Sequence, residues 1–534
     1  MNDAKTVAGA QMNITAMLER AVRLYGLKEA IIDLGEDRRF TYADFGDRTA
    51  RIAGGLRGLG ADPGTSIAIL ALNGFRYLET YFACAGLRAM VNPLNIRLAP
   101  AEIAFILNDS ETKILIVDAT FAPMYEAIKD QLETIENVIF CSPGDAPAGT
   151  ISYDDLVAGS QPAELEAPGD ENEIVGLFYT GGTTGRPKGV MLSHRNLVTN
   201  AYHGLVALGY DEDDIYLHAA PMFHLADGAS TFAVTWAGAA HVFIPAFDPG
   251  ATLRALESER VTRALLVPAM VGAVLEHPDF DKTDLSALQF VLYGASPMPL
   301  GLLKRALERF GCDFAQGYGM TEAAPLAVVL TPADHRRAIA PGGDQRLLTA
   351  AGREVLGVRV RVLGDDGEEV RPGEPGEIVV SGPNVMLGYW RRPDETAAVL
   401  PGDGWYRTGD MATIDEQGYI YIVDRKKDMI VSGGENVYST EVESAISTHP
   451  GVVAVAVIGV PDDTWGEAVK AIVVRRDESV TEESITTHCR ELIAGYKLPK
   501  SVDFVEELPI SGAGKVLKRD LREPYWEGVD RRVN

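Results

Sequence analysis

Twelve residues, Tyr179-Thr-Gly-Gly-Thr-Thr-Gly-Arg-Pro-Lys-Gly-Val190, combine four glycines, three threonines and one lysine. The apolar run at residues 173–178 predicts a buried strand before this stretch, and Ser193 predicts the cap of a helix after it. Converging backbone N–H groups, hydroxyl groups and an ammonium group bind phosphate, which favours a phosphate-binding loop over an ordinary surface loop. The stretch is not a Walker A loop, because Pro187 precedes Lys188 and no serine or threonine follows it.

Further motifs with chemically active residue types lie along the chain. They are Pro221-Met-Phe-His224, Tyr293-Gly-Ala-Ser296, Gln316-Gly-Tyr-Gly-Met-Thr-Glu322, Tyr406-Arg-Thr-Gly-Asp410, Asp424-Arg-Lys-Lys-Asp428 with Gly433-Gly434, and Pro509 through Gly514-Lys515. In type and order these motifs resemble those of the acyl-adenylate-forming enzymes, which include acyl-CoA synthetases, luciferases and peptide-synthetase adenylation domains. The matches run from about residue 40 to residue 519, and on them the chain is identified as a member of that family.

The composition sets limits that agree with a soluble enzyme. A chain of 534 residues predicts two or more domains, and its 46% apolar and 23% charged residues are typical of globular proteins. The net charge, 49 − 76 = −27, argues against nucleic-acid binding. The four cysteines show neither metal nor disulfide spacing, and residues 1–20 contain no apolar segment. We therefore expect a cytoplasmic protein with no integral membrane segment.

Apolar runs of strand length alternate with helical patterns and predict an α/β fold. The capping-box pattern at residues 41–44 predicts a helix to about residue 60, and a strand is expected at 66–72. Valine alternation between turns at residues 357–380 predicts β-hairpins, which suggests a small β-barrel-like subdomain. The pattern changes past Asp424 to a compact α+β unit. We expect an N-terminal adenylation domain of layered α/β subdomains over residues 1–425 and a small mobile C-terminal domain over residues 426–534.

The resemblance implies a site for ATP. The residues expected around the β- and γ-phosphates are Thr180, Gly181, Gly182, Thr183, Thr184 and Lys188. Thr321 and Glu322 are expected near the α-phosphate, where Glu322, with Thr184, would hold Mg²⁺. A single carboxylate joined by phosphate oxygens and waters is how proteins normally bind this ion.

The nucleoside part of ATP is assigned by the same resemblance. The residues expected around adenine are Gly294, Ala295, Ser296, Gln316, Gly317 and Tyr318, with Ile422 also near the nucleotide. Asp410 is expected to accept the two ribose hydroxyl groups, and Arg425 to reinforce the ribose or the α-phosphate.

The C-terminal motifs are expected to act in turn. Lys515 matches the family's mobile lysine, whose ammonium group would neutralise charge while the carboxylate attacks the α-phosphate. Lys427 is the expected hinge, about which the domain turns between the two half-reactions. The residues Gly433, Gly434 and Glu435 are expected to line the channel for coenzyme A.

The acid is the least determined part of the prediction. His224 is the expected gate of the acyl tunnel, and the residues expected to line the tunnel are Ala226, Gly228, Ala229, Gly319 and Pro325. Their small size suits a medium- to long-chain fatty acid or a planar aryl-propenoate. Three roles are open for Asp227: it could cap a helix, face solvent or contact the substrate. Of these, we favour the helix cap.

Together these observations predict an ATP-dependent acid–thiol ligase that makes acyl-CoA through an acyl-AMP intermediate, with a fatty acid as the expected substrate. The alternatives are an aryl or cinnamate-type CoA ligase, an adenylation enzyme that loads a carrier protein, and a non-catalytic acyl- or nucleotide-binding protein. The expected partners are a small carboxylic acid, ATP and CoA. Whether the chain forms a homodimer is left open.

Overall fold

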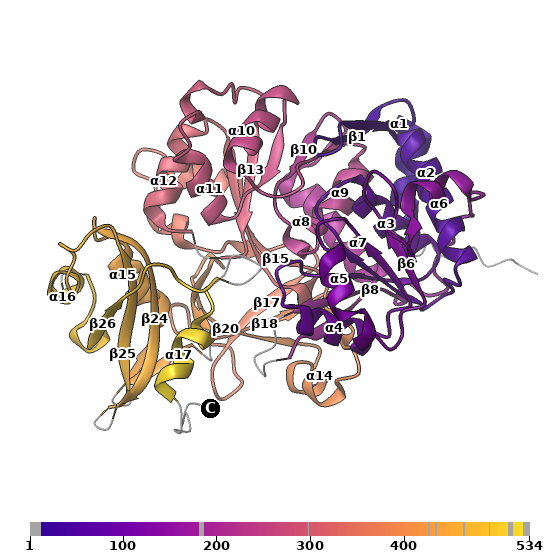
Figure 1. The fold of residues 1–534 in the computed structure, drawn as a ribbon. Coiled ribbons are helices and arrows are strands. Elements are labelled where there is room, and N and C mark those ends of the chain that lie inside the picture. The colour runs from indigo at the N-terminus through magenta and orange to yellow at the C-terminus, as the bar shows by residue number, and fades with distance from the viewer. Residues whose placement is uncertain are drawn as a thin grey trace, which may run out of the picture.

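A large N-terminal part and a smaller C-terminal unit make up the molecule (Figure 1). The computed structural model describes residues 12–180, 186–296, 298–425, 428–432, 435–462, 465–490, 492–510 and 516–526. Two large sheets and one small sheet form the N-terminal part, and a fourth sheet forms the centre of the C-terminal unit. The predicted α/β fold class is confirmed.

The first large sheet has nine strands in the order β16-β15-β14-β13-β12-β10-β11-β1-β2. Its strands are β1 (Glu29–Asp33), β2 (Arg38–Thr41), β10 (Ile215–His218), β11 (Ala240–Phe243), β12 (Arg263–Leu265), β13 (Phe290–Gly294), β14 (Asp313–Gly319), β15 (Leu326–Leu330) and β16 (Arg353–Glu354). Six neighbouring strands of this sheet pair in parallel, in the order β1, β11, β10, β12, β13 and β14. The strands β2, β15 and β16 are antiparallel and lie at the two edges. The loops that follow β10, β13 and β14 therefore leave the sheet at the same edge.

The second large sheet has eight strands in the order β19-β9-β8-β4-β3-β5-β6-β7. Its strands are β3 (Ser66–Leu70), β4 (Met90–Pro93), β5 (Ile114–Val117), β6 (Asn137–Phe140), β7 (Ile151–Ser152), β8 (Ile174–Thr180), β9 (Lys188–Ser193) and β19 (Gly388–Tyr389). The glycine-rich stretch joins β8 to the antiparallel strand β9, with Thr180 opposite Lys188. The predicted helix cap at Ser193 is confirmed, and the strand β9 stands between the glycine-rich stretch and the helix that Ser193 caps.

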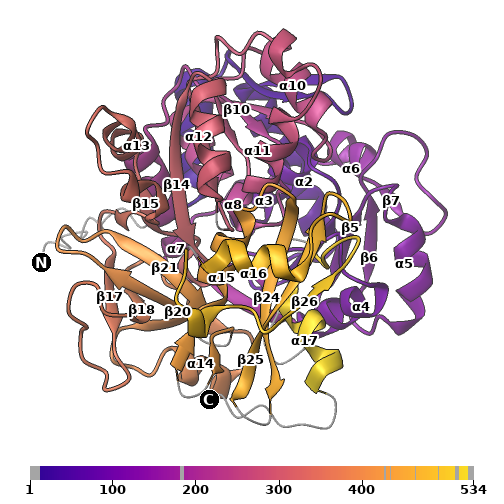
Figure 2. The same ribbon diagram turned by 90° about the vertical axis from the view of Figure 1, so that its left-hand side faces the viewer.

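Helices cover both sheets (Figures 1 and 2). They are α1 (Thr15–Tyr25), α2 (Tyr42–Gly58), α3 (Phe75–Gly86), α4 (Pro100–Asp109), α5 (Ala122–Ile128), α6 (Tyr153–Gly159), α7 (His194–His203), α8 (Leu225–Gly228), α9 (Ser230–Ala237), α10 (Pro249–Ser258), α11 (Pro268–Leu275), α12 (Leu300–Arg309), α13 (Pro332–Ile339) and α14 (Pro393–Val399). The predicted capping box is present at Thr41 and Asp44, at the start of α2. Every residue of α3 is buried, and this helix contacts β1 of one sheet and β3 and β4 of the other, so the two sheets share one core.

The predicted hairpins near residues 357–380 belong to a small antiparallel sheet in the order β17-β18-β20-β21. Its strands are β17 (Arg359–Leu363), β18 (Gly376–Ser381), β20 (Tyr406–Ile414) and β21 (Ile420–Arg425). This small sheet lies between the two large sheets and the C-terminal unit (Figure 1). Its last strand ends at Arg425, two residues before the expected hinge, Lys427.

The C-terminal unit has its own apolar core, which includes Val442, Ile446 and Val469. Its strands are β22 (Ile430–Ser432), β23 (Glu435–Val437), β24 (Val452–Asp462), β25 (Gly466–Arg475) and β26 (Ser501–Phe504), and its helices are α15 (Ser439–Ser447), α16 (Glu482–Arg490) and α17 (Lys518–Trp526). The separate core agrees with an independent unit, while the division between residues 425 and 426 stays a prediction. Across the described ranges, no helix combines the length and the apolar character needed to span a bilayer.

A buried polar cluster ties the C-terminal unit to β21. Ser439 Oγ donates to Asp424 Oδ2 at 2.7 Å, and Lys518 Nζ donates to Ser439 Oγ at 2.6 Å. Lys518 also forms an ion pair with Glu443 at 2.7 Å. Burial raises the pKa of the Asp424 carboxyl group, and the positive charge of Lys518 and the hydrogen bond from Ser439 oppose that rise. One carboxylate of the N-terminal part is therefore hydrogen-bonded to a residue of the C-terminal unit.

Candidate active site

The ends of β13 and β14 lie side by side at the centre of the candidate site. Gly294 is opposite Gly317 in the parallel register, so the turn at Ala295 and Ser296 adjoins the turn after β14. A Cβ atom added at Gly294 would lie 2.3 Å from the Gly317 carbonyl oxygen, and one at Gly319 would lie 1.8 Å from the Pro325 carbonyl oxygen. Glycine is thus required at both positions by the close approach of backbone, in addition to any contact with a ligand.

Two alanines adopt left-handed backbone conformations beside these strand ends. Ala295 has φ +63° and Ala324 has φ +62°. Residues other than glycine rarely adopt such angles, and strained backbone tends to gather at functional sites. Ala295 is itself an expected adenine contact, and Ala324 directly precedes Pro325, an expected contact of the acid.

A tyrosine, an aspartate and an arginine from three strands meet next to β14. Tyr318 Oη donates to Asp410 Oδ2 at 2.8 Å, and Arg425 Nε lies 3.1 Å from Asp410 Oδ1. Asp410 on β20 is opposite Arg425 on β21 in the antiparallel register. Burial raises the pKa of the Tyr318 hydroxyl, and the Asp410 carboxylate raises it further and also raises the pKa of the Arg425 guanidinium. Sequence reasoning assigned all three residues to the nucleotide site, and the fold brings them into contact.

Two further residues assigned to the nucleotide lie on the same strands. Gln316 on β14 and Ile422 on β21 are both half-buried. Neither makes a contact that assigns it a role, so both assignments remain predictions.

Tyr389, which sequence reasoning missed, contacts both Glu322 and Lys188. Glu322 is in a one-turn 3₁₀ helix, Thr321–Ala323, and its Oε1 accepts a hydrogen bond from Tyr389 Oη at 3.0 Å. Lys188 Nζ lies 5.2 Å from the centroid of the Tyr389 ring, within cation–π range. Burial and then the Glu322 carboxylate raise the pKa of the Tyr389 hydroxyl, which therefore stays a donor. Tyr389 reaches the site because β19 pairs with β9, a pairing between segments far apart in the sequence.

An acidic residue on α14 holds the lysine of the glycine-rich stretch. The Lys188 ammonium group forms an ion pair with Glu395, whose other oxygen lies 3.7 Å from Arg392 Nε. Arg392 in turn contacts Asp109 at 3.0 Å, and Tyr179 Oη donates to the same carboxylate at 2.7 Å. These contacts tie both strands of the hairpin to the segment around α14. Nothing in the sequence pattern singled out Glu395 or Asp109.

Replacing Glu395 by glutamine should lower the KM for ATP. Phosphate groups that bind Lys188 must compete with the Glu395 carboxylate and are repelled by it. The Lys188 and Glu395 side chains are 15% and 32% exposed, so their ion pair is worth about 1 kcal/mol, and the KM should fall by about fivefold. The measurement is steady-state pyrophosphate release at varied ATP.

Glu111→Gln is the matched control for Glu395→Gln. Glu111 pairs with the neighbouring Arg391 at 2.7 Å in an exposed contact, so its loss changes the net charge equally without touching Lys188. A KM for ATP that rises in Glu395→Gln, or that falls equally in both variants, would contradict competition at Lys188.

The predicted acid-gating histidine begins a short helix. His224 is the N-cap of α8, and its Nδ1 accepts a hydrogen bond from Ala226 N at 3.1 Å. Ala226 is half-buried, and Ala229 is buried. Pro325 follows Ala324 at the turn that contacts Gly319.

Two expectations on α8 need correction. A Cβ atom at Gly228 would lie 2.5 Å from the Met222 carbonyl oxygen and 3.1 Å from Tyr81 Oη, so this glycine allows close packing and does not leave room for an acyl chain. Asp227 does not cap the helix. It is fully buried and is hydrogen-bonded to Tyr216 and His218 on β10, partners that only the tertiary fold brings near.

Several predicted residues lie outside the described part of the chain. They are Gly181, Gly182, Thr183, Thr184, Lys427, Gly433, Gly434 and Lys515. Glu435, also assigned to the CoA channel, lies exposed on β23. The assignments of these residues remain predictions.

The acidic groups around the site fit an ion held chiefly by its substrate. Over the residues that the structure describes, no group of three or more His, Cys, Asp or Glu side chains could hold a metal. Mg²⁺ requires few protein ligands because phosphate oxygens and water supply the rest. Glu322 therefore suits the predicted ion, and Thr184, the second predicted ligand, lies outside the described residues.

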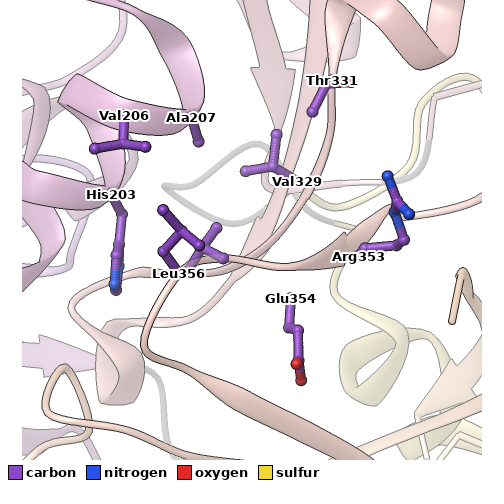
Figure 3. A pocket seen from close by; sticks show the side chains of 9 residues that line it. His203, Val206, Ala207, Val329, Thr331, Arg353, Glu354 and Leu356 are labelled. Carbon is purple, nitrogen blue, oxygen red and sulfur yellow. The ribbon is translucent and has the colours of Figure 1, made fainter.

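A separate pocket of about 330 Å³ lies at the edge of the nine-stranded sheet (Figure 3). Its lining residues are His203, Val206, Ala207, Val329, Thr331, Arg353, Glu354, Val355 and Leu356. Burial lowers the pKa of His203 to about 4, so its ring is neutral. No residue predicted for the ATP or acid site belongs to this pocket.

Comparison with known proteins agrees with the motifs over nearly the whole chain. The model of the AMP-binding enzyme family matches residues 18–390, and that of the AMP-binding enzyme C-terminal domain matches residues 441–515. A feruloyl-CoA synthase of an Amycolatopsis species is 44% identical over 91% of this chain and 94% of its own length. A long-chain-fatty-acid–CoA ligase of Thermus thermophilus is 37% identical over 97% of both chains.

A solved structure extends the likeness to the fold. The anthranilate CoA ligase in complex with anthranoyl-AMP superposes with a TM-score of 0.86 at 29% identity, over 96% of this chain and 97% of that one. The predicted enzyme class, an AMP-forming acyl-CoA synthetase, is confirmed. The chain belongs to the AMP-binding enzyme family.

Proposed function

We propose that this enzyme joins an aryl-propenoic acid to coenzyme A in two steps, with ATP converted to AMP and pyrophosphate. The observation that supports the nucleotide chemistry best is the convergence of Lys188, Glu322 and the Asp410–Arg425 pair around Tyr318 and Tyr389. A cation, a carboxylate and a hydroxyl-binding acid within one site match the triphosphate, its metal ion and the ribose.

In the first step a carboxylate oxygen attacks the α-phosphorus, and the bond from that phosphorus to the bridging oxygen of pyrophosphate breaks. Lys188 neutralises the departing phosphates, and Asp410 accepts the ribose hydroxyls, which fixes the nucleotide for in-line attack. Glu322 would hold Mg²⁺, which when bound supplies positive charge to the phosphate oxygens. Lys515 would approach from the C-terminal unit to neutralise the two anions that must meet.

In the second step the thiol of CoA attacks the acyl carbonyl carbon, the proton leaves the thiol, and AMP departs with the bond electrons. This step needs the thiol where Lys515 stood in the first step. We infer that the C-terminal unit turns about Lys427 between the steps and that Gly433, Gly434 and Glu435 then line the path of CoA.

The proposal for the carboxylic acid substrate rests on the named relatives and on the packing of α8. The feruloyl-CoA synthase shares 44% identity with this chain, and its name gives its product as the CoA thioester of an aryl-propenoic acid. Gly228 packs directly against the Met222 carbonyl oxygen, so the space beside this glycine is filled by protein, which supports a compact acid over a long chain at this point. A medium- or long-chain fatty acid is the second candidate, favoured by the likeness to the long-chain ligase.

The deciding experiment is a pyrophosphate-release assay over ferulic, 4-coumaric, benzoic, octanoic and palmitic acids, with acyl-CoA identified by mass spectrometry. We expect the highest kcat/KM with the two propenoic acids. Higher values with octanoic or palmitic acid would instead support the fatty-acid candidate.

The choice of thiol acceptor separates a CoA ligase from an enzyme that loads a carrier protein. Preformed acyl-AMP is mixed with either CoA or a phosphopantetheinylated carrier protein, and thioester formation is followed. Faster transfer to CoA supports the proposal, and transfer to the carrier alone contradicts it.

A further inference from the structure

A continuous chain of buried polar groups lies directly behind the helix that carries the gating histidine. Asp227 on α8 accepts a hydrogen bond from Tyr216 Oη at 3.0 Å, and its other oxygen lies 2.7 Å from His218 Nδ1. His218 Nε2 lies 2.9 Å from His241 Nδ1, and His241 Nε2 lies 3.0 Å from Thr235 Oγ1. All five side chains are fully buried. None of them is needed for the nucleotide chemistry derived above.

The chain joins two short helices to two strands that are themselves paired in the nine-stranded sheet. Tyr216 and His218 are on β10, His241 is on β11, Asp227 is on α8 and Thr235 is on α9. The His218 and His241 rings are also stacked, with centroids 5.2 Å apart. The helix α8 is only one turn long, so its own backbone fixes its position weakly. The carboxylate of Asp227 supplies the missing anchor.

Donors and acceptors can be matched along the whole chain. Burial lowers the pKa of His241, so its ring is neutral. Thr235 then donates to His241, His241 donates to His218, and His218 donates to Asp227. A buried carboxylate is tolerated only while such donors remain in place, so displacement of α8 is strongly opposed. The polar chain thus favours a single position of this helix.

The loop that precedes α8 is held from the opposite side by a residue of the other large sheet. Asn73, which follows β3, donates to the carbonyl oxygens of His218 and Ala220 at 3.3 and 2.9 Å, and its Oδ1 accepts from Met222 N at 2.9 Å. Tyr81 Oη donates to the Met222 carbonyl oxygen at 2.8 Å. The loop that carries Phe223 and His224 is therefore fixed at both ends.

We propose that Asp227 and His218 are positioning residues that set the place of His224 and Ala226 along the wall of the acid site, and so decide which acids fit. This inference rests on the proposed function, because it takes that wall as the acid-binding surface. Asp227 acts through α8 and does not touch the reacting atoms. Its loss should therefore alter acid selectivity while leaving ATP binding unchanged.

The test is Asp227→Asn, which keeps the size of the side chain and removes its charge. The amide can be accommodated because the two histidines can reverse the direction of their hydrogen bonds, so the variant should fold. We expect the KM for the preferred acid to rise by about tenfold, as for other small changes in a substrate pocket, with the KM for ATP unchanged. The ratio of kcat/KM between an acid with a broad aromatic group, such as ferulic acid, and an acid with a narrow alkyl chain, such as octanoic acid, should change as well.

Asp214→Asn is the matched control. Asp214 and Arg263 form a largely buried ion pair, 2.5 Å apart, at the opposite end of β10. The control should destabilise the fold by a similar degree in thermal unfolding without changing acid selectivity. Equal changes of selectivity in both variants, or unchanged selectivity in folded Asp227→Asn, would overturn the proposal.

Amide hydrogen exchange gives a readout that is independent of activity. Residues 219–228 should exchange faster in Asp227→Asn than in the wild type, and residues around Asp410 should not. Unchanged exchange at 219–228 would also overturn the inference. Failure of the wild-type enzyme to activate any acid would instead count against the proposed function, since the exchange result does not depend on it.

Discussion

Glu322→Gln should reduce the rate of acyl-AMP formation by about 100- to 1000-fold, the usual effect of removing one preorganised electrostatic group from a transition state. Glutamine keeps an oxygen that can accept the hydrogen bond from Tyr389, so the turn at residues 321–323 should keep its shape. What is lost is the negative charge that would hold Mg²⁺ against the α-phosphate. The rate is measured as pyrophosphate release at saturating acid, over a range of Mg²⁺ concentrations.

Tyr389→Phe separates the charge of Glu322 from its hydrogen bond. This variant removes the donor at 3.0 Å and leaves the carboxylate, so its loss of rate should be much smaller. A Glu322→Gln enzyme with near wild-type rate and unchanged dependence on Mg²⁺ would refute the metal assignment. An equal loss in the two variants would show that the hydrogen bond, and not the charge, is what matters.

Lys515→Ala should slow the first half-reaction by about 100- to 1000-fold and leave the second largely intact. The ammonium group is expected to neutralise charge only while a carboxylate attacks ATP, so the loss is specific to that transition state. Purified acyl-AMP mixed with CoA should still give acyl-CoA at near the wild-type rate. Rapid-mixing experiments on each half-reaction measure the two rates separately.

A second lysine of the same unit provides the control for Lys515→Ala. Lys500 directly precedes β26, its Nζ lies 5.7 Å from the centroid of the Trp465 ring, and Lys500→Ala changes the net charge equally. It should leave both half-reactions unchanged. If Lys515→Ala adenylates normally, or loses both steps alike while folded, the lysine does not have the proposed role.

Local sequence signals were sufficient for most elements of the fold. The capping box at Thr41 predicted the start of α2, and apolar runs predicted strands such as β3 and β8 to within a few residues. These features depend on neighbours in sequence, which is why periodicity and capping chemistry reveal them. The same holds for Asp410 and Tyr318, because their motifs are local and ordered.

What the sequence missed depends on contacts between distant segments. Tyr389 and Glu395 approach Lys188 only because β19 pairs with β9, and no pattern near residue 188 announces that pairing. Asp227 looked like a helix cap because capping is the commonest local use of an aspartate beside a short helix. Its true partners lie on β10, and the next link of the chain is on β11. The space around Gly228 was misjudged for a related reason, since a small residue can mark either a channel or a close contact.

The contact between Asp424 and Ser439 has a consequence for how the enzyme passes between its two steps. Asp424 precedes residues 426–427 and Ser439 follows them, so a turn about that segment must separate a buried carboxylate from its donors. The separation has no stable halfway point, because a carboxylate partly removed from its partners is neither solvated nor paired. The C-terminal unit should thus exchange between discrete states by activated jumps, unlike a tethered body that diffuses freely. The waiting time before each jump, and not the speed of the motion itself, would then set how often the unit changes state.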